Sequence, residues 1–163
     1  MAESISLVGT GKREDEYRNL LPQIASLLEG EPDLIANLAN VTAVLKEAFG
    51  FFWVGFYLMK EGELVLGPFQ GPLACTRISL DRGVCGAAAS RRETLVVPDV
   101  EQFPGHIACS SLSKSEVVVP MLHGDEVLGV LDVDSHLLED FDEIDADWLG
   151  RIVDLVVRHH WTA

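Results

Sequence analysis

The sequence predicts an α+β domain in which a central, mainly antiparallel sheet of six strands is packed against helices. Apolar residues recur at helical spacing near both ends of the chain, and the middle consists of short apolar runs joined by tight turns. This order of elements is typical of α+β domains. The 163 residues suit one domain, with N-terminal helices over about 14–49, the sheet and its loops over about 51–135, and a C-terminal helix over about 142–160.

The helices are predicted from the period of their apolar residues and from their end signals. The first covers about residues 14–28, and Gly30 stands where a C-cap is expected. The second begins at Pro32 and continues to about Phe49, and Gly50 ends it. A short Ala-rich helix is expected over 83–90, and the last helix over about 144–159.

The strands are predicted from aromatic and β-branched runs bounded by turn residues. The segment 67–72 is rich in Gly and Pro and is expected to be a loop, and 100–113 is expected to be a long loop with little regular structure. The six predicted strands are 51–58, 63–66, 77–80, 95–98, 116–122 and 127–133.

The composition excludes several classes of function. A net charge of −14 argues against nucleic acid or anionic lipid as a partner, because both require a basic surface. The chain starts Met-Ala-Glu-Ser without a signal-peptide pattern, and no apolar run approaches the ~20 residues of a membrane span, so we expect a cytoplasmic protein. No glycine-rich phosphate loop and no zinc-type Cys or His spacing is present, so we expect neither a cofactor nor a metal.

The segment between Phe69 and Ser115 holds all three cysteines, and long loops in compact domains are commonly functional. Cys109 is followed by several serines, so its neighbours in the sequence are polar. His106 and the loop N–H groups could generate a reactive thiolate there. The alternative is that the three cysteines are small buried hydrophobic residues.

Acidic and aromatic residues mark the predicted sheet. Glu116 opens one strand, while Asp132 and Asp134 end the next and share a face of it. Because an apolar run precedes these aspartates, we expect partly buried carboxyls with a raised pKa that could donate a proton; ordinary solvent-facing carboxylates are the alternative. Trp53 and Tyr57 also share a face, and they form either core packing or an aromatic wall for a cationic or thioether group.

Seven segments together resemble the free methionine-(R)-sulfoxide reductase family, a branch of the GAF domains, and the resemblance covers the chain from about Tyr17 to the last helix. It therefore implies a GAF fold. The segments are ANLAN at 36–40, WVGFYL at 53–58, LGPFQG at 66–71, GVCGAA at 83–88, FPGHI at 103–107, SEVVVP at 115–120 and GVLDVDS at 129–135.

The resemblance implies an enzyme that reduces the free amino acid methionine-(R)-sulfoxide. Cys109 matches the family's nucleophile and would become a sulfenic acid as methionine leaves. Cys75 matches the resolving cysteine, which would form a disulfide with Cys109 that thioredoxin reduces. Cys85 is a rival for a catalytic or recycling role.

The resemblance also implies the walls of the pocket. Glu116, Asp132 and Asp134 would hold the substrate ammonium group and polarise or protonate the S=O bond, while Trp53 and Tyr57 would close around the ε-methyl group. Ser110 follows Cys109 where many relatives carry an acid, which makes the field at the thiol less negative. The fold is also compatible with a homodimer.

Two other functions use the same residues differently. A GAF domain could act as a small-molecule sensor without turnover, since a fold does not determine a function. The cysteine set and the acid cluster favour the reductase, because a sensor needs neither. A thiol peroxidase or redox sensor could use the cysteines without the acids.

Overall fold

The computed structural model describes residues 3–107 and 109–161, and residue 108 of the predicted 100–113 loop lies outside them. The described helices and strands follow the predicted order. No helix in this part of the chain combines the length and hydropathy needed to cross a membrane. The elements are α1 (Arg13–Glu29), α2 (Leu34–Phe49), β1 (Trp53–Lys60), β2 (Glu63–Gln70), β3 (Arg77–Ile78), α3 (Gly83–Arg91), β4 (Leu95–Val97), the 3₁₀ helix η1 (Val100–Gln102), β5 (Ser115–His123), β6 (Glu126–Ser135) and α4 (Glu143–His160).

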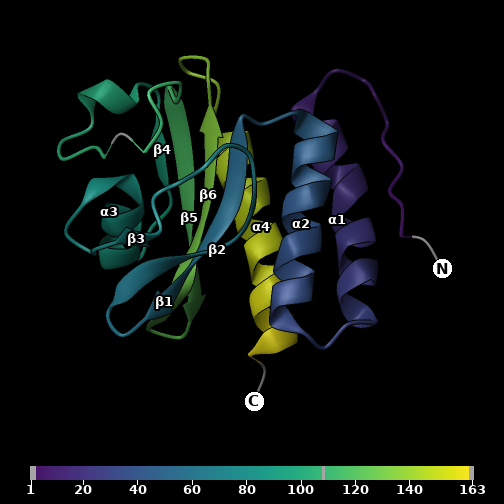
Figure 1. The fold of residues 1–163 in the computed structure, drawn as a ribbon. Coiled ribbons are helices and arrows are strands. Elements are labelled where there is room, and N and C mark those ends of the chain that lie inside the picture. Colours follow the sequence, from purple (N-terminus) through teal and green to yellow (C-terminus); the bar gives the residue numbers. More distant parts are fainter. Residues whose placement is uncertain (1–2, 108, 162–163) are drawn as a thin grey trace.

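The six strands form one sheet in the order β3-β2-β1-β6-β5-β4, and every neighbouring pair is antiparallel. Helices α1, α2 and α4 cover one face of this sheet, and α3 lies on the other face together with the irregular segments around it (Figure 1). The predicted α+β architecture is therefore confirmed, with strands β1, β6 and β5 at the centre of the sheet.

Alternating side chains on the central strands build two separate cores. On β1, Phe56 packs toward α1, α2 and α4, whereas Trp53 and Tyr57 pack on the α3 side. On β6, Leu131 belongs to the three-helix side and Val130 to the α3 side. Each fully buried side chain of this size contributes about 1.5–3 kcal/mol to folding. The acidic residues that the sequence places on β5 and β6 lie on the smaller, α3 side.

The prediction of a loop over 67–72 is wrong for residues 67–70, because β2 continues to Gln70 alongside β1. A register shift between Gly55 and Tyr57 accommodates one extra residue of β2. Strand β3 pairs with β2 only at Leu64 and Val65, so Pro68 lies where β2 has no second neighbour and its missing N–H costs no ladder bond. Glycine and proline therefore mark a bulged edge segment here.

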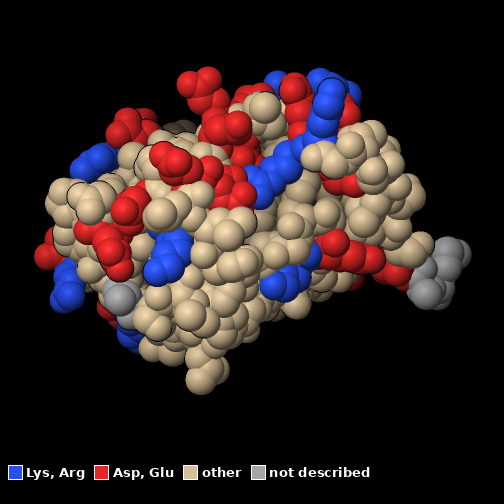
Figure 2. All heavy atoms as spheres, turned by 90° about the horizontal axis from the view of Figure 1, so that it is seen from above, with Lys and Arg blue, Asp and Glu red and all other residues tan. Residues whose placement is uncertain are grey.

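The charged surface is predominantly acidic, as the net charge of −14 requires. On the face shown in Figure 2, the lysine and arginine side chains form small separate groups among acidic ones. This face offers no continuous basic surface to a polyanion.

Candidate active site

The strand register gathers three carboxyls on the α3 face of the sheet. Glu116 on β5 is paired directly with Asp134 on β6, and Asp132 lies two residues before Asp134 on the same face. Their exposed fractions are 6%, 9% and 7% for Glu116, Asp134 and Asp132. The prediction that Asp132 and Asp134 share a face is confirmed, and all three acids are buried more completely than the partial burial that the sequence predicts.

The aromatic wall stands beside the carboxyls on the neighbouring strand. Trp53 pairs with Asp134 across the β1–β6 ladder, and the Trp53 ring packs against Tyr57 at a centroid distance of 6.0 Å. Gly55 makes this arrangement possible, because a Cβ there would lie 2.5 Å from the Trp53 ring. The aromatic ring can thus lie across its own strand, where a side chain at position 55 would otherwise stand.

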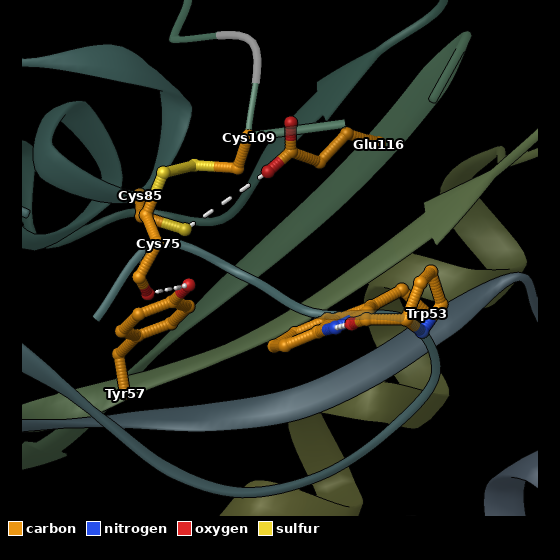
Figure 3. The surroundings of a disulfide bond; sticks show 7 residues. Trp53, Tyr57, Cys75, Cys85, Cys109 and Glu116 are labelled. Carbon is orange, nitrogen blue, oxygen red and sulfur yellow. Dashed lines mark hydrogen bonds between the residues drawn. A yellow bond between two sulfur atoms is a disulfide. The ribbon is translucent and has the colours of Figure 1, made fainter. Parts of the chain in front are cut away.

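Both aromatic residues also hold the segment that carries Cys75. The Tyr57 hydroxyl donates to the Cys75 carbonyl oxygen at 2.8 Å, and the Trp53 indole N–H donates to the Pro72 carbonyl oxygen at 3.0 Å. Figure 3 shows the two rings on β1 beneath this segment. The aromatic side chains therefore position the loop as well as line the site.

All three cysteines lie on the α3 side of the sheet, as the carboxyls do. Cys75 and Cys109 form a disulfide with a Cα–Cα distance of 5.4 Å; Cys109 is exposed and Cys75 half-buried. Cys85 is a buried free thiol on α3, and its Sγ lies 3.9 Å from Oε1 of Glu116 (Figure 3). The alternative, in which all three cysteines are buried, is therefore wrong for Cys75 and Cys109, and only Cys85 is buried.

A cavity with about 570 Å³ of empty space, its open mouth included, lies between the loops and the sheet. Residues far apart in the sequence meet around it, because β1, β5, β6, α3 and two loops all contribute side chains. Its lining includes Trp53, Tyr57, Cys85, His106, Cys109, Ser113, Glu116, Asp132 and Asp134.

The cavity wall favours protonated acids. Burial raises the pKa of Glu116 and Asp134 well above the usual carboxyl range, and the neighbouring Asp132 raises both further. Burial likewise raises the pKa of Asp132, whose Oδ1 has no hydrogen-bond partner among the described residues. A buried acceptor without a partner costs free energy unless a ligand satisfies it. The wall can therefore donate a proton from a protonated acid, and it can accept a hydrogen bond from a ligand at Asp132 Oδ1.

The cavity keeps two nearby groups uncharged. Burial raises the pKa of the Cys85 thiol well above its usual value, and the adjacent carboxyls add to this effect. Burial lowers the pKa of His106, so its imidazole is neutral at pH 7. A neutral His106 cannot act as the cation that would stabilise a thiolate at Cys109.

Comparison with known proteins places this site in a family. The family profile described as "GAF domain" matches residues 33–158. The free methionine-R-sulfoxide reductases of Saccharomyces cerevisiae and Escherichia coli are 38% and 43% identical to this chain; the matches cover 95% and 84% of it and 91% and 84% of theirs. The structure of the Neisseria meningitidis free methionine-R-sulfoxide reductase in complex with its substrate superposes with a TM-score of 0.94 at 52% identity, covering 97% of this chain and 95% of that one.

The chain belongs to the free methionine-(R)-sulfoxide reductase family of GAF domains. The resemblance seen in the sequence is thereby confirmed. GAF domain-containing protein A of Dictyostelium discoideum, which is 62% identical over 96% of this chain and 99% of its own, carries only the fold in its name.

The structure brings together the residues that the free methionine-(R)-sulfoxide reductase resemblance singles out. Seven of them line the cavity, and Cys75 is bonded to one of the seven. Their individual roles stay predictions. The seven are Trp53, Tyr57, Cys85, Cys109, Glu116, Asp132 and Asp134.

Sequence reasoning missed several apolar residues of the cavity wall, among them Phe52, Leu73 and Ile78. Phe52 lies within the predicted strand 51–58, directly before Trp53, which is the only signal that could have suggested it. Leu73 lies in the connection from β2 to β3, and Ile78 is the last residue of β3. Their positions at the cavity depend on how that connection folds over the sheet, and no periodic pattern in the sequence predicts that.

Proposed function

We propose that this protein reduces free methionine-(R)-sulfoxide to methionine, with Cys109 as the nucleophile. The single observation that supports this most is the joint placement of Cys109 and three buried carboxyls around one small cavity. The yeast and E. coli relatives carry this activity in their names, and the N. meningitidis structure was determined with its substrate. Such a reduction requires a cysteine nucleophile and a proton donor at one site, and the Cys75–Cys109 disulfide is the form expected after one turnover.

The first half of the reaction uses the reduced protein. The Cys109 thiolate attacks the sulfoxide sulfur while a carboxyl of the cluster protonates the departing oxygen. The oxygen then transfers to the Cys109 sulfur, the transient bond between the two sulfur atoms breaks, and methionine leaves while Cys109 becomes a sulfenic acid. The sulfoxide is reduced by two electrons and Cys109 is oxidised by two.

The second half regenerates the thiols. The Cys75 thiol attacks the Cys109 sulfenic acid, which releases water and forms the Cys75–Cys109 disulfide. Thioredoxin then reduces this disulfide by exchange. The exposure of Cys109 supports the step, because an external dithiol must reach one of the two sulfur atoms. Thioredoxin as reductant and a homodimeric assembly both stay predictions.

The cavity chemistry suits each part of the substrate. The unpartnered Oδ1 of Asp132 can accept a hydrogen bond from the substrate ammonium group. Glu116 and Asp134 can supply the proton, since burial raises the pKa of both. The faces of Trp53 and Tyr57 suit the methyl group on a sulfur centre that carries partial positive charge.

Single-turnover assays with each epimer of free methionine sulfoxide test the proposal. Reduced protein without added reductant should release one equivalent of methionine from the R epimer and lose two thiols. Hydrogen peroxide in a parallel assay distinguishes a thiol peroxidase. Loss of thiols to peroxide without methionine formation from the sulfoxide would contradict the proposed function.

A further inference from the structure

We propose that the cavity also binds a thiophilic divalent cation, represented by Zn²⁺, through the Cys85 thiolate and the carboxylates of Glu116 and Asp132. One potential ligand atom from each of the three side chains lies within 4.8 Å of the others, and all three residues are buried. The second part of the proposal rests on the proposed function: a bound cation excludes the sulfoxide from the same cavity.

The spacing of the three ligand atoms suits zinc. Typical bond lengths of about 2.3 Å to sulfur and 2.0 Å to carboxylate oxygen imply that tetrahedral ligands lie roughly 3.5 Å apart. Cys85 Sγ and Glu116 Oε1 lie 3.9 Å apart. Small side-chain rotations therefore suffice to close the site. The ligands come from α3, β5 and β6, which fix their positions from three directions.

Asp132 supplies an independent indication of a ligand. Its Oδ1 is buried and has no hydrogen-bond partner among the described residues, and Asp132 is one of the residues that line the cavity. A cation would satisfy this oxygen and neutralise the repulsion between the two carboxylates. A thiolate combined with oxygen ligands selects zinc or cadmium over magnesium or calcium, which prefer oxygen alone.

The ligand set explains why spacing in the sequence predicts no metal. Cys85 and Glu116 are 31 residues apart, and Asp132 lies on the next strand. No short Cys or His motif can record a site assembled in this way. The expectation of no metal came from the absence of such motifs, so it does not bear on this cluster.

The site exists independently of turnover. Cys85 takes no part in the Cys75–Cys109 disulfide, so the oxidised protein keeps all three ligands and has no other free thiol. Cation binding can therefore be measured without substrate and without reductant. Because each ligand must lose its proton to bind a metal, the affinity for Zn²⁺ should rise with pH.

Titration of the oxidised protein with Co²⁺, followed by competition with Zn²⁺, tests the site. We expect one equivalent of Co²⁺ to produce a thiolate-to-metal charge-transfer band in the near ultraviolet, and Zn²⁺ to abolish it. Cys85→Ser should remove the band, and Glu116→Gln should weaken binding at least tenfold. The matched control is Glu126→Gln, an exposed acid at the start of β6, which should leave binding unchanged.

Absence of the band, or its persistence in Cys85→Ser, would overturn the proposal. Added methionine should weaken Co²⁺ binding if the two share the cavity, and undiminished binding would refute that sharing. The outcomes separate this proposal from the proposed function. A protein that binds Co²⁺ through Cys85 yet forms no methionine contradicts only the reductase, and a working reductase without the band contradicts only the cation site.

Discussion

Glu116 on β5 and Asp134 on β6 are paired directly across the ladder, and both side chains are more than nine-tenths buried in the cavity wall. Burial raises the pKa of both carboxyls well above the usual range, and the neighbouring Asp132 raises both further, so at least one of them retains its proton there. The arrangement keeps a proton donor ready for the sulfoxide oxygen.

The pH dependence of single-turnover methionine formation should reveal this donor. Burial raises the pKa of Glu116 and Asp134, so the donor is lost, and the rate falls, as the pH rises through that raised pKa. Glu116→Gln or Asp134→Asn should slow the reaction by about 10²–10⁴-fold, the usual contribution of a general acid, and one of them should also remove the alkaline limb. Asp147→Asn, an exposed acid on α4, is the control. An unchanged profile in both cavity variants would assign the proton donor elsewhere.

The same burial should cost the protein stability. Burial raises the pKa of Glu116 in the folded state above its unfolded value, so the unfolded chain binds fewer protons over that range and stability is lost as pH rises toward the folded pKa. Glu116→Gln removes this penalty and should raise the melting temperature, increasingly so at higher pH. A gain of about 1 kcal/mol corresponds to about 2–4 °C in a chain of this size. A gain that shrinks with rising pH, or a lower melting temperature throughout, would contradict this account.

Two glycine substitutions should distinguish a glycine that close packing of two strands requires from a glycine that only lowers helix propensity. A Cβ at Gly129 would overlap the carbonyl oxygen of Tyr57 and lie 3.1 Å from the Leu58 Cα, whereas a Cβ at Gly150 in α4 meets nothing within 4 Å. Gly129→Ala should destabilise the protein by about 3 kcal/mol and lower activity, because it separates β1 from the strand that carries Asp132. Gly150→Ala should stabilise it by about 0.5–1 kcal/mol. Denaturant unfolding measures both, and equal effects would contradict the close packing of β1 and β6.

Recycling should depend on apolar contacts around the disulfide. Leu112 is 60% exposed and stands three residues after Cys109, a position where a protein reductant must approach. Leu112→Ser should reduce kcat/KM for thioredoxin by about fivefold, equivalent to partial loss of one buried leucine. Reduction by a small dithiol should be unaffected, because it needs no docking surface. Equal slowing with both reductants would point to a change in the disulfide itself.

Much of the fold could be predicted from the sequence because hydrophobic periodicity records which face of each element is buried. The two-residue spacing of Asp132 and Asp134 after an apolar run correctly predicted buried carboxyls on one face. The same reasoning failed at Pro68, where glycine and proline suggested a loop. Their effect depends on whether the strand has a second neighbour, which only the sheet order determines.

The surroundings of the cysteines could be predicted only in part. The serines next to Cys109 indicated a functional cysteine and not a core one, and its bond to Cys75 followed from the family resemblance alone. The contact between Cys85 and Glu116 joins α3 to β5, and no local pattern records such a long-range contact. This is why the sequence left the position of Cys85 open between the core and the site.

The central claim is that the Cys109 sulfur takes the oxygen from the sulfoxide, and trapping that oxygen tests it most directly. Reduced Cys75→Ser protein is mixed with methionine-(R)-sulfoxide and a sulfenic-acid trap, and the modified residue is located by mass spectrometry. We expect one equivalent of methionine and one trapped sulfenic acid at Cys109, with neither in the Cys75→Ser/Cys109→Ser variant. A full equivalent of methionine from the variant that lacks Cys109, or a trapped sulfenic acid at Cys85 instead, would contradict the account.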